Sequence, residues 1–130
     1  MDASLFTMIL RGDIPSHKVY EDELTYAFLD IHPKTPGHTL VIPKKQVEFV
    51  WDMDDKDYDA LMTTVKKVAT RLHDVLGTTY VGEMIEGVMV PHAHVHVFGF
   101  STIEEYRRNP DQEGVPDHSA LEKMAKKLAF

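Results

Sequence analysis

The chain has 130 residues, 43% of them hydrophobic and 27% charged, which is ordinary for one globular domain with its own core. The net charge of −7 argues against binding to nucleic acid, which needs clustered lysines and arginines, and no apolar run is long enough to span a membrane. Residues 1–13 lack a basic segment and a cleavage site, so we expect no signal peptide and a cytoplasmic protein. The absence of cysteine is compatible with that location.

Short elements are predicted in the first half of the chain. In chain order they are a helix over 4–10, strands over 18–21 and 24–29, and a strand over 39–42. The helix ends near Gly12, and the first two strands form a hairpin. Residues 32–37, HPKTPG, contain two prolines and a glycine and must form a loop, while Pro43 stops the strand that follows.

The strongest helical signal comes next, because apolar residues recur there at spacings of three and four. These residues are Tyr58, Leu61, Met62, Val65, Val68, Ala69, Leu72, Val75 and Leu76. Acidic residues at 54, 55 and 57 precede them and Gly77 follows them, as the helix dipole and C-capping favour. The pattern predicts one long amphipathic helix.

The second half of the chain completes an α+β domain. In order, it is predicted to contain a strand over 79–85, a tight turn at 86–87, a strand over 88–100, a polar loop over 107–117, and a helix over 119–128 with a Ser119/Glu122 capping box. Five strands, one long central helix and short flanking helices define the expected architecture. We expect a single domain over 1–130, with its core at about 4–100 and an extension over 101–130.

The stretch PHAHVHVFGF, residues 91–100, carries three histidines at alternate positions. Alternate residues of a strand share a face, so His92, His94 and His96 are expected on one side. Small and β-branched residues lie between them and suit a buried back. The pattern predicts one strand with an apolar back and three imidazoles on an exposed front.

Three chemical interpretations of this front compete. The first is a metal site. Strand rise separates the Cα atoms of His92 and His96 by roughly 13 Å, so two neighbouring rings could bind one ion. All three rings could bind it only if the strand were strongly bent. The second interpretation is an exposed, imidazole-rich face without chemistry. The third is a nucleophile with helpers, since a neutral imidazole attacks phosphorus well and flanking imidazoles can donate protons.

PHAHVHVF resembles the H-x-H-x-H signature of the histidine triad (HIT) superfamily. Residues 12–48, which include the segments AFLDI and PGHTLVIPKK, resemble the N-terminal half of that family almost position by position. Together the two blocks cover roughly residues 4–100. The resemblance implies a HIT-like fold: a five-stranded antiparallel sheet with one long central helix, a short N-terminal helix and a C-terminal helix.

The resemblance also implies a nucleotide hydrolase or transferase that acts at the α-phosphate through a nucleotidyl-histidine intermediate. It assigns His94 as the nucleophile. It assigns His96 to the phosphate oxygens and the leaving group, and His92 to support of the neighbouring rings. His38, in PGHTLV, matches a further family histidine that approaches the triad from an adjacent strand. The alternative is a histidine that only caps or serves the loop beside Gly37.

A nucleoside site is implied as well. Asp30 matches the family acid that binds the ribose hydroxyls, and a carboxylate suits a cis-diol. The positions that match the base pocket are Leu5, Phe6, Ile9, Phe28 and Ile31. Each of these is equally well explained as an ordinary core residue, and an apolar slot says little about which base it holds.

Two departures from the family pattern matter. Many relatives carry polar groups before the triad that grip the phosphate, whereas this chain has Val88 and Met89. Zinc-bearing relatives have a C-x-x-C near the N-terminus and a histidine after PKK, whereas this chain has Ser4, Thr7 and Gln46. None of the three is a competent zinc ligand at neutral pH, so we expect no metal and no cofactor.

The leading hypothesis is an enzyme that cleaves nucleoside phosphoramidates, or related nucleotides, and releases a nucleoside monophosphate. The alternatives are a dinucleoside polyphosphate hydrolase, a nucleotide-binding regulatory module with little turnover, and a metal-binding protein. The expected partners are a small-molecule nucleotide and a second copy of the chain. The resemblance implies a homodimer formed through the long helix and an edge strand.

Overall fold

The computed structural model describes residues 2–130. The elements in chain order are α1 (Leu5–Leu10), β1 (Lys18–Glu21), β2 (Thr25–Leu29), β3 (Thr39–Pro43), the 3-10 turn η1 (Val50–Asp52), α2 (Asp55–Leu76), β4 (Tyr80–Met84), β5 (Val95–Phe100), α3 (Ile103–Arg107) and α4 (His118–Leu128). The strands form one five-stranded sheet in the order β1-β2-β3-β5-β4, and all neighbours are antiparallel. The predicted α+β architecture is confirmed.

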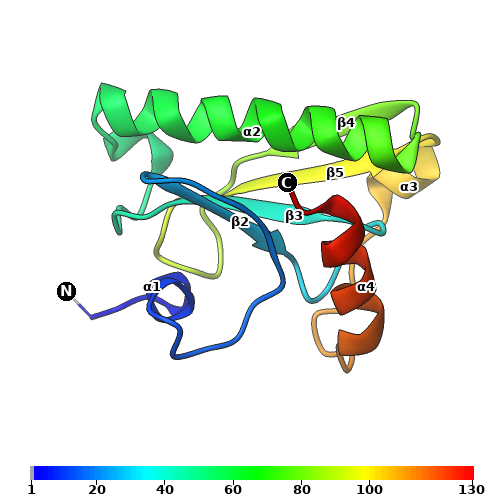
Figure 1. Ribbon diagram of the computed structural model, residues 1–130, viewed down its shortest axis with the longest axis horizontal. Helices are drawn as coiled ribbons and strands as arrows, with labels where there is room; N and C mark the ends of the chain where they lie inside the picture. Colours follow the sequence, from blue (N-terminus) through cyan, green and yellow to red (C-terminus); the bar gives the residue numbers. More distant parts are fainter. Residues whose placement is uncertain (1) are drawn as a thin grey trace.

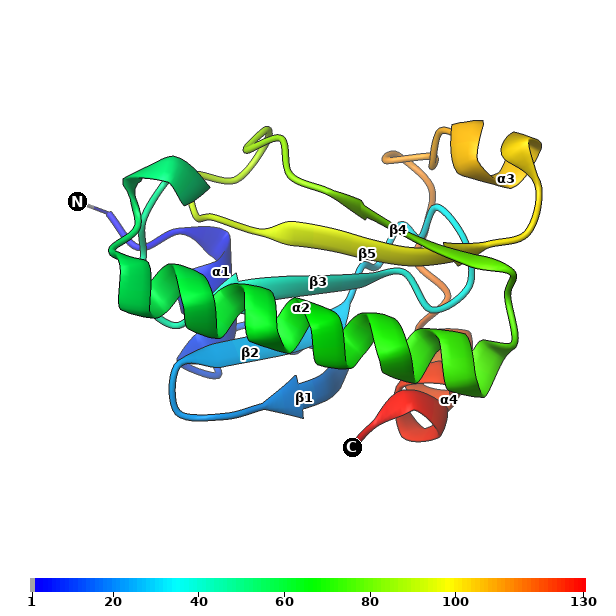
Figure 2. The same cartoon turned by 90° about the horizontal axis from the view of Figure 1, so that it is seen from above.

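The two faces of the sheet are covered by different helices. α2 runs across one face along its whole length, and α1 lies on the opposite side (Figure 1). α4 stands at the end of the sheet beside β1 and the C-terminal half of α2 (Figure 2). No helix within residues 2–130 is both long and apolar enough to cross a membrane.

Alternation along the central strands sends side chains to these two layers, because successive residues of a strand point to opposite faces. The core on the α2 side is built from alternate residues such as Ala27, Leu29, Val41, Val95 and Val97, together with Leu61, Val65, Val68 and Leu72 of α2. The smaller core on the α1 side contains Phe6, Tyr26, Phe28, Leu40 and Ile42. The two cores explain why β2 and β3 are buried along their entire length.

The helix predicted over 58–76 is confirmed and starts slightly earlier. Asp54 caps its N-terminus by accepting a hydrogen bond from the backbone N–H of Asp57. Gly77 ends it in the left-handed region, with φ of 68°. Burial of a leucine or valine of its inner face contributes about 1.5–3 kcal/mol, so packing on the sheet stabilises the helix more than its caps do.

The strand predicted over 88–100 is wrong in its first half, because β5 begins only at Val95. Pro91 has no N–H to donate to a neighbouring strand. Met89 has a φ of 80°, which is not an extended conformation. The N–H of Ala93 donates to the carbonyl of Val47 in the loop before η1, so the chain leaves the sheet here.

The C-terminal extension also differs from expectation. The short helix α3 was not predicted, and it carries a complete capping box between Thr102 and Glu105. The capping box predicted at Ser119 and Glu122 is wrong, because α4 begins one residue earlier and Asp117 is its N-cap. Aspartate caps a helix as well as serine does, and the Asp117 side chain accepts a hydrogen bond from the backbone N–H of Ala120.

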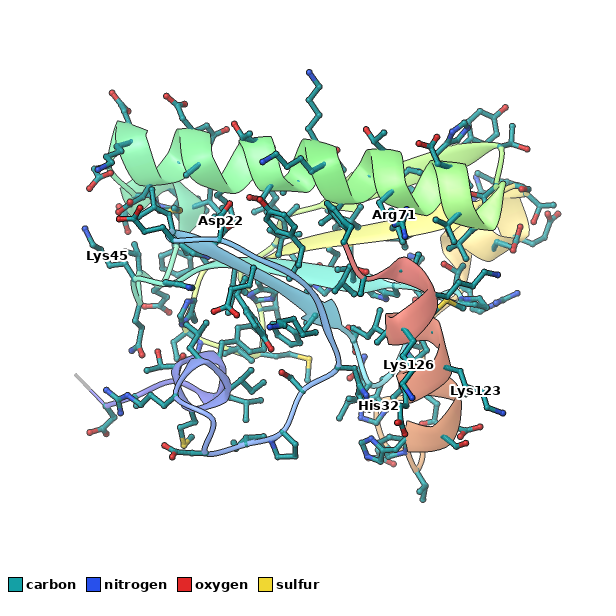
Figure 3. The ribbon with its side chains drawn as sticks, viewed as in Figure 1. Asp22, His32, Lys45, Arg71, Lys123 and Lys126 are labelled. Carbon is teal, nitrogen blue, oxygen red and sulfur yellow. The ribbon has the colours of Figure 1, made fainter. Side chains whose placement is uncertain are left out.

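The C-terminal end of the extension contacts α2 and β1. Arg71 points from α2 toward the C-terminal end of α4 (Figure 3), where its Nε donates to the carbonyl of Leu128 at 2.9 Å. Phe130 stacks on Tyr20 with ring centroids 4.8 Å apart, and its N–H donates to the carbonyl of Val19. These contacts hold α4 against the sheet that bears the histidines.

Candidate active site

Three of the predicted catalytic rings meet on the sheet face opposite α2. His94 immediately precedes β5, His96 lies on β5, and His38 immediately precedes β3, which pairs with β5. The ring centroids of His94 and His96 are 5.2 Å apart, and those of His38 and His96 are 5.1 Å apart. The tertiary structure therefore brings His38 to the triad from 58 residues away in the chain.

The expectation of an exposed histidine face is wrong. His92 is 0% exposed and His94 is 4% exposed. The cause is α1, because Phe6 packs edge-to-face on both rings, with centroids 5.9 and 5.2 Å away. The nucleophile predicted from the sequence thus lies in a largely apolar setting beneath the N-terminal helix.

The hydrogen bond of His94 defines its tautomer. Its Nδ1 lies 2.8 Å from the backbone carbonyl oxygen of His92. A carbonyl oxygen only accepts, so Nδ1 carries the proton and Nε2 keeps its lone pair. The backbone thereby orients the ring and leaves a nucleophilic nitrogen on the opposite edge.

His38 and His96 form a directional hydrogen-bond chain. The backbone N–H of Lys34 donates to Nδ1 of His38 at 3.0 Å, so the proton of a neutral His38 is on Nε2. That nitrogen lies 2.9 Å from Nδ1 of His96 and donates to it. The remaining proton of a neutral His96 is then on Nε2, where it can be donated to a bound group.

Burial keeps these rings neutral. Burial, with smaller contributions from His96 and Lys34, lowers the pKa of His38 to about 3. Burial also lowers the pKa of His96 to about 4, with smaller contributions from His94 and Lys34. Both residues are therefore uncharged at neutral pH, as the hydrogen-bond chain requires.

Asp30 completes this cluster. Its Oδ2 lies 3.7 Å from Nε2 of His38, and its Oδ1 accepts a hydrogen bond from the backbone N–H of His32 at 2.9 Å. Burial raises the pKa of the Asp30 carboxyl group, and the His32 hydrogen bond opposes that shift. A largely buried acid with one oxygen not tied to the backbone suits hydrogen bonding to hydroxyl groups.

Three side chains lie close enough together to hold a metal ion. One ligand atom from each of Asp30, His38 and His96 lies within 4.8 Å of the others. The hydrogen bonds argue against that use. Nε2 of His38 carries a proton, and the only lone pair on that ring already accepts from Lys34. A metal-ligating imidazole needs a free lone pair, so a His38 ring that makes these two hydrogen bonds does not suit a cation.

The positions that resemble the ligands of zinc-bearing relatives come together around His92. Ser4 Oγ lies 2.9 Å from Nδ1 of His92, and Thr7 Oγ1 lies 3.3 Å from it. Gln46 Oε1 accepts from Thr7 Oγ1 at 2.6 Å and from the Ser4 backbone N–H at 2.8 Å. On its other side, His92 Nε2 lies 2.8 Å from the carbonyl oxygen of Pro43. The four side chains form a hydrogen-bonded cluster.

The proton positions in this cluster follow from the same reasoning. Nε2 of His92 must donate to the Pro43 carbonyl, so its Nδ1 accepts. The Thr7 hydroxyl donates to Gln46, which leaves the Ser4 hydroxyl as the donor to His92. Burial lowers the pKa of His92, partly offset by the Pro43 bond, and this agrees with a neutral ring.

The predicted base-pocket residues separate into two groups. Phe6 and Phe28 are buried in one apolar cluster with Ile9 beside them, and the two phenylalanine rings meet edge-to-face at 5.5 Å. Leu5 and Ile31 are instead 44% and 41% exposed. Ile31 lines a cavity of about 350 Å³ between the 31–37 loop, Arg108 and α4.

Two charged residues near the triad were not singled out from the sequence. The ammonium group of Lys34 lies over the rings of Phe98 and Tyr106, 5.0 and 5.3 Å from their centroids. Glu86 Oε1 lies 3.9 Å from Nε2 of His96. Their positions in the HPKTPG loop and in the segment just before the triad were the only sequence signals, and many surface charges share such positions.

The fold and this arrangement of rings define a histidine triad protein. The family model described as "HIT domain" matches residues 11–102, and the chain belongs to this family.

Named relatives support the same assignment. An uncharacterized HIT-like protein of Borreliella burgdorferi is 42% identical over 100 residues, which is 72% of each chain. The adenosine 5′-monophosphoramidase of Schizosaccharomyces pombe is 35% identical over 97 residues, covering 72% of this chain and 71% of that protein. A crystal structure of a Hit-like protein from Bartonella henselae, described as involved in cell-cycle regulation, superposes with a TM-score of 0.82. That structure is 30% identical and covers 96% of this chain and 93% of its own.

Proposed function

We propose that the protein hydrolyses nucleoside 5′-phosphoramidates, or transfers their nucleotidyl group, through a covalent intermediate on His94. The observation that carries the proposal is the hydrogen bond from His94 Nδ1 to the His92 carbonyl, which leaves the lone pair on Nε2. The kinship with an adenosine 5′-monophosphoramidase supports the substrate class.

The first step forms a bond between His94 Nε2 and the α-phosphorus and breaks the P–N bond of the substrate. The electron pair of that bond leaves with the nitrogen, which accepts a hydrogen bond from His96 Nε2 and takes up a proton from solvent. In the second step water attacks phosphorus and the His94–P bond breaks, while a proton of that water returns to solvent. The products are a nucleoside monophosphate and an amine.

Binding of the nucleoside is proposed for the residues around Phe6. The apolar cluster of Phe6, Ile9 and Phe28 suits stacking and burial of a base, and it adjoins the His94 ring. The Asp30 carboxylate, close to His38, suits the ribose hydroxyls. The exposed Leu5 and Ile31 are assigned to the rim of this site.

Mass spectrometry tests the proposal directly. Mixing the protein with adenosine 5′-phosphoramidate should give a transient adenylyl adduct and release AMP. His94→Ala should give neither, whereas His73→Ala, which removes an exposed histidine of α2, should behave as the wild type. AMP release by His94→Ala at the wild-type rate would refute the assignment of the nucleophile.

A nucleotide-binding module with slow turnover is the second candidate, and one observation favours it. Val88 and Met89, in the segment just before the triad, are 57% and 78% exposed and offer no side-chain hydrogen bonds to a phosphate. Saturable AMP binding without adduct or product would select this candidate over the enzyme.

We also propose a homodimer that uses β4 and α2. β4 is an edge strand of the sheet, and Tyr80 at its start is 56% exposed. An exposed edge strand needs a cover, and a second copy of the same strand can supply one. Light scattering at micromolar concentration should give about twice the monomer mass of 14.8 kDa, and a monomer mass would refute the dimer.

A further inference from the structure

Glu86 faces the outer nitrogen of His96. Its carboxylate oxygen is 3.9 Å from His96 Nε2, which is longer than a hydrogen bond, and its side chain is 47% exposed while that of His96 is 14% exposed. The position is set by the sheet, because Met84 at the end of β4 pairs directly with His96 on β5. Glu86 follows two residues later and stands over the open edge of the ring.

The nitrogen that Glu86 faces is the end of the hydrogen-bond chain from Lys34 through His38. Its proton is the one available to a departing group, so the leaving group must lie close to His96 Nε2 during the reaction. A carboxylate within about 4 Å of that nitrogen is then a near neighbour of the leaving group. Its charge acts on whatever charge the leaving group carries.

The negative charge of the Glu86 side chain is not paired with a lysine or arginine in the part of the chain that the structure describes. Within residues 2–130, no lysine or arginine lies within ion-pair distance of its carboxylate. Lys34, whose charge reaches His96, has its ammonium group over Phe98 and Tyr106. The apolar Val88 and Met89 that follow Glu86 supply no cation either.

We propose that Glu86 is the residue that selects the leaving group by its charge. It disfavours nucleotides in which a further phosphate leaves from the α-phosphorus, and it favours those in which an amine, neutral or protonated, leaves. The inference rests on the proposed function, because it takes the triad to be the site where the leaving group departs. It predicts that this site prefers phosphoramidates to dinucleoside polyphosphates, although both would react at the α-phosphorus. Repulsion between like charges in a partly exposed site corresponds to a discrimination of about tenfold.

Binding provides the first test, because it needs no turnover. ADP carries a second, anionic phosphate at the position of the leaving group, and AMP has no group there. The ratio of their dissociation constants, Kd of ADP over Kd of AMP, therefore reports on the leaving-group position. Titration calorimetry should show that Glu86→Gln lowers the ratio about tenfold. The effect should shrink with added salt, because the carboxylate is half-exposed.

Glu83→Gln is the matched control. Glu83 lies on β4, three residues before Glu86, and its replacement changes the net charge by the same amount. It pairs with Val97 and so faces the α2 side of the sheet. The ratio should stay at the wild-type value in this variant. An equal fall in both variants, or an unchanged ratio in Glu86→Gln, would overturn the role of Glu86.

Turnover provides the second test and keeps the two proposals separate. For the wild type, kcat/KM should be higher with adenosine 5′-phosphoramidate than with diadenosine tetraphosphate, and Glu86→Gln should narrow this preference about tenfold. If the wild type releases no AMP while the binding ratio still responds to Glu86→Gln, the proposed function fails and the charge selection stands. If AMP itself does not bind, both proposals are overturned.

Discussion

Nε2 of His38 and Nδ1 of His96 lie 2.9 Å apart and share one proton, although His38 immediately precedes β3 and His96 lies on β5. The bond connects the loop before β3 to the outer edge of the triad. Because Lys34 donates to the other nitrogen of His38, the direction of the bond is defined, and the outer nitrogen of His96 becomes a donor. A backbone group four residues before His38 thus orients the proton that the proposed reaction uses.

Replacing His38 tests this relation. His38→Ala removes the donor to His96, frees the ring to rotate or to exchange tautomers, and should lower kcat by about 100-fold with little change in KM. His38→Gln retains an N–H donor and should recover part of the loss. Steady-state kinetics on adenosine 5′-phosphoramidate measure both variants. Equal kcat values for His38→Ala and the wild type would show that the bond has no part in catalysis.

Stability should fall on acidification. Burial lowers the pKa of His38 to about 3 and of His96 to about 4, against an ordinary value of 6.5. Between about pH 6.5 and 4 the unfolded chain therefore binds protons that the folded chain does not. The free energy of unfolding decreases as pH falls through that window, by at most about 1.4 kcal/mol per pH unit for each ring.

Urea unfolding at a series of pH values measures this dependence. His38→Gln should reduce the slope between pH 6.5 and 4, whereas the exposed His73→Gln should not. Asp30 acts in the opposite direction, because burial raises the pKa of its carboxyl group. A slope that is the same in wild type and His38→Gln would contradict the neutral, buried state of this ring.

The Ser4 hydroxyl should contribute more to the free energy of unfolding than its place near the N-terminus indicates. Ser4→Ala leaves Nδ1 of the fully buried His92 without its nearest donor and should lower the free energy of unfolding by about 1–3 kcal/mol. Ser4→Thr keeps the hydroxyl and should stay close to the wild type. Chemical denaturation compares the two, and equal losses would point to packing of the side chain instead of the hydrogen bond.

We expect the protein to work without zinc. The cluster of Ser4, Thr7, Gln46 and His92 satisfies its own hydrogen bonds and contains one side chain that commonly ligates zinc. Elemental analysis of untagged protein should find zinc well below one equivalent, and activity should survive chelation. Stoichiometric zinc, with activity lost on chelation and restored by zinc, would contradict this expectation.

Local patterns in the sequence predicted most of the fold. The spacing of Leu61, Val65, Val68 and Leu72 predicted α2, because a helix with one buried face imposes a repeat of 3.6 residues. Strands, turns around proline and glycine, and the resemblance to the HIT family also depend on residues close together in the chain. The membership of that family is confirmed by the match over residues 11–102.

Only the tertiary structure decided where the histidines lie. Alternation predicted one strand and an exposed face, but Pro91 and the left-handed Met89 turn the chain, and Phe6 of α1 covers His92 and His94. No local pattern encodes these contacts, because their partners are far apart in the chain: 88 residues separate Ser4 from His92, and 58 separate His38 from His96. The tautomers and the burial that lowers the pKa values arise from such distant neighbours, so the chemistry of the rings is a property of the folded chain.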